Sequence, residues 1–91
     1  MKHAVHTSEA AKKRAAYAVG HLQGVAKMLE EGRYCIDVIK QIDAVQAALK
    51  KLKQVMLEDH LNGCVVEVMQ GENQKEREAA INEVLEVYKS Q

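Results

Sequence analysis

The chain has 91 residues, enough for one small domain but not for two, so a monomer would have a small core and marginal stability. Apolar residues make up 47% of it, yet Phe, Trp and Pro are absent, which excludes an aromatic core and favours long helices over a turn-rich β fold. The 13 basic and 13 acidic residues cancel, which excludes a generally basic, histone-like protein. We therefore expect an all-α, single-domain protein over residues 1–91 that oligomerises.

The first predicted helix runs from about residue 8 to residue 31. Thr7 and Ser8 are good N-cap residues, and the apolar residues that follow recur at intervals of three and four, as on one face of a helix. Gly32 is a residue type that often ends a helix. The segment 1–7 that precedes this helix is expected to be a mobile tail.

The second predicted helix runs from about residue 34 to residue 66 and carries a coiled-coil seam. At about 1.5 Å per residue it would be roughly 50 Å long, more than a globule of this size needs. We expect its seam to pack along another subunit in an antiparallel two-fold dimer. The seam residues alternate intervals of three and four over three heptads: Cys35, Val38, Ile42, Val45, Leu49, Leu52 and Met56.

A third helix is predicted over about residues 74–89. Gly71 marks the turn before it, and Asn73 with Glu76 has the spacing of a capping box. An apolar stripe follows, made of Ile81, Val84, Leu85 and Tyr88. The sequence thus predicts a three-helix protomer with one long central helix.

The cellular compartment determines how the two cysteines are interpreted. No stretch approaches the roughly 18 apolar residues of a membrane span, and the N-terminus lacks the apolar region of a signal peptide. A cytoplasmic location is therefore expected, where cysteines stay reduced. This favours metal ligands, redox groups or inert core residues over a structural disulfide.

His60 and Cys64 are four residues apart on the second predicted helix, so their side chains are expected on one face. Thiolate and imidazole together suit Cu(I), Zn(II), Ni(II) or Co(II) rather than Mg(II) or Ca(II). Taken alone, such a pair is also typical of a helix-end histidine beside an inert cysteine. Cys35 lies 25 residues before His60, about 37 Å along a continuous helix. In the antiparallel dimer, however, it comes opposite His60 and Cys64 of the other subunit.

The neutral total charge hides a division along the chain. Residues 1–57 carry ten Lys or Arg against five Asp or Glu, whereas residues 58–91 carry three against eight. A polyanion is expected to bind the first part, at two basic clusters that helix packing can join. His21, in contrast, is expected to be an ordinary surface histidine. The clusters are Lys12, Lys13 and Arg14 on the first helix, and Lys50, Lys51 and Lys53 on the second.

Two stretches of the sequence resemble the copper-sensing operon repressor family (CsoR). They are residues 33–46, with Arg33, Tyr34 and Cys35, and residues 57–64, which end in His60 and Cys64. The resemblance runs from about residue 12 to residue 87. It implies a disc-like tetramer of three-helix protomers that binds operator DNA when metal-free and dissociates when the effector binds.

The ligand residues separate the branches of this family. The set Cys35, His60 and Cys64 resembles the copper-sensing branch, which implies Cu(I) as the effector. His3 falls where nickel-sensing relatives have an additional ligand, so a Ni(II) repressor is the alternative. A copper storage or delivery protein is a rival from another class, although the basic clusters argue against it. An enzyme is not expected, because no general base accompanies the ligands.

The resemblance also assigns roles outside the metal ligands. It implies that Tyr34 and Glu83 act near the metal-bound His60, where the free imidazole N–H needs a partner. It implies DNA contacts for Arg14 and Lys51. The first helix is nevertheless poor in Arg, so the residues that contact bases are not specified by the sequence.

Overall fold

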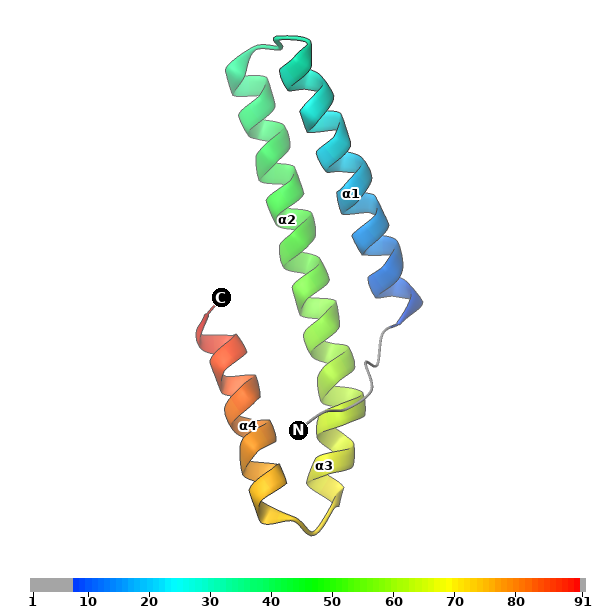
Figure 1. Cartoon of the computed structure of the whole chain (residues 1–91), viewed down its shortest axis with the longest axis vertical. Coiled ribbons are helices and arrows are strands. Elements are labelled where there is room, and N and C mark those ends of the chain that lie inside the picture. The colour runs from blue at the N-terminus through cyan, green and yellow to red at the C-terminus, as the bar shows by residue number, and fades with distance from the viewer. Residues whose placement is uncertain (1–7, 91) are drawn as a thin grey trace. The chain divides into compact units, whose positions relative to one another are not determined.

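The structure, a computed structural model, describes residues 8–90. The predicted all-α class is confirmed, and none of the described helices is long and apolar enough to cross a membrane. The predicted mobile tail, residues 1–7, lies outside the described residues. The chain divides into two compact units, the first ending at Met56 and the second beginning at Leu57. The elements are α1 (Glu9–Glu30), α2 (Cys35–His60), the π-helix η1 (Leu61–Val65), α3 (Val66–Gln70) and α4 (Gln74–Lys89) (Figure 1).

In the first unit, α1 and the first part of α2 lie side by side and run in opposite directions (Figure 1). Their shared core is a cluster of Val25, Val38 and Val45, against which Met28 packs. The buried residues recur every seven positions, as expected for two helices that meet along one narrow seam. Ala11 and Ala18 continue this pattern on α1.

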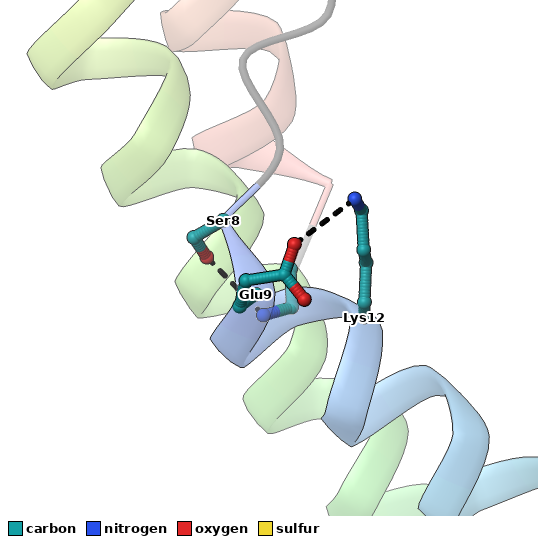
Figure 2. Close-up of polar contacts among 4 residues, drawn as sticks. Ser8, Glu9 and Lys12 are labelled. Carbon is teal, nitrogen blue, oxygen red and sulfur yellow. Dashed lines mark hydrogen bonds and ion pairs between the residues drawn. The ribbon is translucent and has the colours of Figure 1, made fainter.

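Local hydrogen bonds set both ends of α1. The Ser8 Oγ accepts a hydrogen bond from the Ala11 N–H at 3.2 Å, and Lys12 pairs with Glu9 at 3.2 Å (Figure 2). At the other end, Gly32 has φ 64°, a conformation that favours glycine. The N–H of Arg33 then donates to the Met28 carbonyl at 3.0 Å, which closes the helix end and reverses the chain into α2.

The predicted seam of α2 is only half covered within this chain. Val38 and Val45 are buried against α1, whereas the alternate seam positions Ile42, Leu49 and Met56 are exposed. A single neighbouring helix covers one side of a coiled-coil seam, so the other side needs a second neighbour. The exposed residues therefore form an apolar strip along the first unit.

The second unit contains the end of α2, η1, α3 and α4. Gly71 makes the turn after α3, and the Arg77 side chain donates a hydrogen bond to its carbonyl. The N-cap predicted for the last helix is present, because Asn73 Oδ1 accepts from the Glu76 N–H at 3.2 Å. Ala80 is fully buried, since α4 packs closely against η1 and α3.

The structure differs from the expectations in this second unit at the end of the second predicted helix. The helix expected to end near residue 66 is an α-helix only to His60, then a π-helix to Val65 and an α-helix again to Gln70. The apolar stripe predicted for α4 is mostly exposed, with Ile81 at 44%, Leu85 at 45% and Tyr88 at 70%.

The Val25, Val38 and Val45 cluster is the main apolar contact of the first unit, so its loss is expected to destabilise the α1–α2 pair. Val38→Ala removes two buried methyl groups and leaves a cavity, for an expected loss of about 2 kcal/mol. Urea unfolding followed by circular dichroism would measure this. The matched change Val19→Ala, at an exposed position, should have little effect, and equal losses would contradict the assignment of the core.

Candidate metal centre and nucleic-acid surface

Cys35 is the first residue of α2, and its thiol is free and exposed. The helix begins here because Val38 donates its backbone N–H to the Tyr34 carbonyl at 3.2 Å, which closes the first turn. Before it, Arg33 pairs with Glu31 at 3.9 Å. The thiol is therefore held at a defined helix end and remains accessible to a metal ion or to another chain.

The segment with the other two predicted ligands contains the π-helix. His60 is the last residue of α2, and Cys64 lies four residues later within η1. The i→i+5 hydrogen bonds of a π-helix widen the turn by about one residue, so residues four apart still lie within one turn. The His60 ring is partly exposed and has no hydrogen-bond partner among the described residues. Short π-helical turns occur frequently at functional sites.

The predicted ligands are divided between the ends of α2. Cys35 belongs to the first unit, and His60 and Cys64 belong to the second. Among the side chains that the structure describes, no three His, Cys, Asp or Glu come together to hold a metal ion. The side chain of Cys64 and the whole of His3, the predicted extra ligand, lie outside this description.

Tyr34 and Glu83, the residues expected near the metal-bound histidine, are both exposed. The Tyr34 carbonyl accepts the hydrogen bond that closes the first turn of α2, and the residue as a whole is 67% exposed. Glu83 lies on α4, the helix that packs against η1, and its carboxylate has no hydrogen bond or ion pair within the described residues. Both side chains are therefore available for new contacts.

The basic residues of the first unit lie on exposed surface. Lys12 is neutralised by Glu9, whereas Lys13 and Arg14 have no ion pair within residues 8–90. They line a cavity together with Ala47 and Ala48 of α2. Since Lys50 and Lys51 lie three and four residues after Ala47, on the same side of the helix, α1 and α2 bring the two predicted clusters to neighbouring parts of one surface.

Tyr17, which lines the same cavity, was not among the residues predicted to be functional. His21 was expected to be an ordinary surface histidine. His21 is partly exposed, and its Nε2 lies 2.8 Å from Gln41 Oε1, which links α1 to α2. The available signal was the spacing of Arg14, Tyr17 and His21, which places them on one side of α1.

The fold and these residues are those of a helical metal-sensitive DNA-binding regulator. A family model described as "Metal-sensitive transcriptional repressor" matches residues 7–90, and the chain belongs to this family. The family consists of transcriptional repressors and not of enzymes, so the chain is a repressor that binds operator DNA and oligomerises.

Individual relatives are similar to this chain over most of their own length. The copper-sensing transcriptional repressor CsoR of Mycobacterium bovis (strain BCG / Pasteur 1173P2) is 45% identical over 85 residues, covering 87% of this chain and 68% of the relative. The Cu(I)-bound CsoR structure from Geobacillus thermodenitrificans NG80-2 is 34% identical with a TM-score of 0.79, covering 99% of this chain and 91% of that one. The nickel-responsive regulator InrS is 29% identical with a TM-score of 0.74, covering 94% and 97%.

Proposed function

We propose that this repressor responds to Cu(I), that it binds operator DNA when metal-free, and that Cu(I) binding releases the DNA and derepresses metal efflux or resistance genes. The observation that carries the proposal is the donor set of Cys35, His60 and Cys64 at the two ends of α2. Two thiolates and one imidazole suit Cu(I), which favours soft sulfur ligands. The similarity to copper-sensing repressors supports the same metal. Because the repressor acts on operator DNA, we expect it to work in the cytoplasm.

The metal site is formed by two subunits. Because α2 is continuous from Cys35 to His60, 25 residues correspond to about 37 Å of helix, too far for one chain to bring these ligands to one ion. In an antiparallel dimer, Cys35 meets His60 and Cys64 of the partner subunit, and each dimer has two equivalent sites. When bound there, Cu(I) supplies a soft electrophilic centre that joins ligands from both chains.

The exposed half of the α2 seam is the dimer contact. Ile42, Leu49 and Met56 form an apolar strip on the first unit that a second copy of α2 would cover. Burial of this strip also adds to the small core of the protomer, which is expected to be marginally stable by itself. Two such dimers form the disc-like tetramer.

The DNA surface consists of the basic residues Lys12, Lys13, Arg14, Lys50 and Lys51, repeated by the symmetry of the tetramer. All of them are exposed in the first unit, where phosphate groups can reach them. Tyr34 and Glu83 hold the imidazole N–H of metal-bound His60 and couple the metal site to the shape of the tetramer.

A Ni(II) repressor of the same fold is the second candidate, supported by His3 in the sequence and by the similarity to InrS. Storage or delivery of copper is disfavoured, because the family consists of transcriptional repressors.

The two metals are distinguished by measuring operator affinity of the reduced apo-protein, alone and with Cu(I), Ni(II), Zn(II) or Co(II). Cu(I) should weaken DNA binding by about 5–150-fold, the usual range of allosteric coupling. His3→Ala should leave the Cu(I) response intact, because three soft ligands remain. A protein that ignores Cu(I), responds to Ni(II) and loses this response in His3→Ala would instead be a nickel sensor. Apo-protein without operator affinity would refute the proposal altogether.

A further inference from the structure

The first unit contains an open cavity of about 490 Å³ between α1 and α2. Lys13, Arg14 and Tyr17 line it from α1, and three alanines line it from α2. Because the α2 side presents only methyl groups, a bulky group can approach both helices closely. The volume lies within the roughly 300–1,000 Å³ that is typical of ligand pockets. The alanines are Ala44, Ala47 and Ala48.

The charges around this cavity favour an anion. Lys13 and Arg14 have no ion pair among the described residues, unlike the neighbouring Lys12, which pairs with Glu9. On α2, Lys40 lies four residues before Ala44 and Lys51 lies four residues after Ala47, so both adjoin the alanines on the same side of the helix. The one acidic residue between these two lysines is Asp43. The positive charges therefore exceed the negative ones at the cavity.

Tyr17 adds a neutral hydrogen-bond donor to these cations. The residue is 65% exposed, and its hydroxyl has no partner within the part of the chain that the structure describes. The ring nevertheless has a defined neighbour, because it contacts His21 edge to face with ring centroids 5.7 Å apart. Gln41 Oε1 can only accept a hydrogen bond, so His21 Nε2 donates to it at 2.8 Å. His21 thus connects Tyr17 to α2.

We propose that the cavity receives a backbone phosphate of the operator DNA, with the Tyr17 hydroxyl donating a hydrogen bond to a phosphate oxygen beside Lys13 and Arg14. This inference rests on the proposed operator binding and identifies where and how one phosphate is held. His21 is a positioning residue that acts through Tyr17. A donor that is already oriented loses less conformational entropy when the phosphate arrives.

The decisive measurement is operator affinity as a function of salt concentration. Tyr17→Phe keeps the ring and removes the hydroxyl, so affinity should fall by about tenfold, as expected for a hydrogen bond to a charged group. Because no cation is lost, the slope of log K against log salt should stay the same. Arg14→Ala and Lys13→Ala should each lower this slope, by about 0.9 for every phosphate contact that is lost in the oligomer. Tyr88→Phe, at an exposed tyrosine of the second unit, is the matched control and should change nothing.

The role of His21 is tested with a double-mutant cycle. His21→Ala should weaken operator binding in the wild-type chain but have little further effect in Tyr17→Phe, since the residue it positions has already lost its donor. Additive losses from the two substitutions would contradict the positioning role. Circular dichroism and Cu(I) affinity, measured on every variant, should remain those of the wild type.

Other results would overturn the cavity assignment. Unchanged operator affinity in Tyr17→Phe would show that the hydroxyl does not contact phosphate. If Tyr17→Phe and Arg14→Ala weakened self-association of the DNA-free protein and left DNA binding intact, the cavity would be a contact with a second copy of the chain. If the wild-type protein did not bind operator DNA, the proposed function would be refuted as well. An unchanged affinity in Tyr17→Phe alone would refute only the assignment of the cavity.

Discussion

Cys35→Ala is expected to abolish the release of operator DNA by Cu(I), while the metal-free variant still binds DNA. The exposed Cys35 thiol is one of three proposed ligands, and the remaining imidazole and thiolate belong to the other subunit. The loss of Cu(I) affinity should exceed the roughly 10–100-fold cost of removing a residue that only supports a ligand. Competition with a Cu(I) chelator, together with DNA binding by fluorescence anisotropy, would measure both effects.

Mixed dimers test whether this site is shared between subunits. One chain carries Cys35→Ala, and the other carries His60→Ala with Cys64→Ala. A dimer of either variant alone should not bind Cu(I) tightly. The mixed dimer should regain one site, because one of its two ends keeps all three ligands. Ser8→Ala is a suitable control, because it removes the Oγ that caps α1 and none of the proposed ligands. Mixed dimers that form without recovering a tight site would show that the subunits are not arranged in this antiparallel way.

Glu83→Ala is expected to separate metal binding from the response to it. Glu83 is exposed on α4, which packs against η1 directly after His60, and its carboxylate has no partner among the described residues. A hydrogen bond from the metal-bound imidazole would form only in the occupied state and could contribute the roughly 1–3 kcal/mol of allosteric coupling. The variant should therefore keep Cu(I) affinity within a factor of about ten and remain on DNA after metal addition.

The matched control for Glu83→Ala is Glu86→Ala, which also removes one negative charge from α4. It should release DNA on Cu(I) binding like the wild type. Tyr34→Phe should reduce the response more weakly than Glu83→Ala. If Glu83→Ala released DNA as completely as the wild type, α4 would have no part in the response.

Local sequence signals predicted the helices because each depends on neighbouring residues. Ser8 and Asn73 cap α1 and α4 through side-chain oxygens, and Gly32 ends the first helix in a conformation that other residues rarely adopt. The separation of Cys35 and His60 along one helix was also evident, because helical rise converts residue number into length. The donor set and its resemblance to the repressor family follow from the sequence in the same way.

Features that depend on contacts between elements were not predicted. Alternation of apolar residues does not specify which half of the α2 seam faces α1, and the structure shows Val38 and Val45 buried with Ile42 and Leu49 exposed. The apolar stripe of α4 likewise does not specify which residue packs, and the structure shows the small Ala80 buried with the larger Ile81 and Leu85 exposed.

The sequence by itself determined the helical class, both ends of α1 and the start of α4, since residue type and spacing govern these directly, and it supplies the proposed metal ligands. Only the tertiary structure decided that His60 is followed by a π-helix, and that Tyr17 and Arg14 line one cavity with three alanines of α2. It likewise decided that His21 connects the two helices through Gln41. Each of these depends on how residues distant in the chain fill the space around one another, which no local pattern encodes.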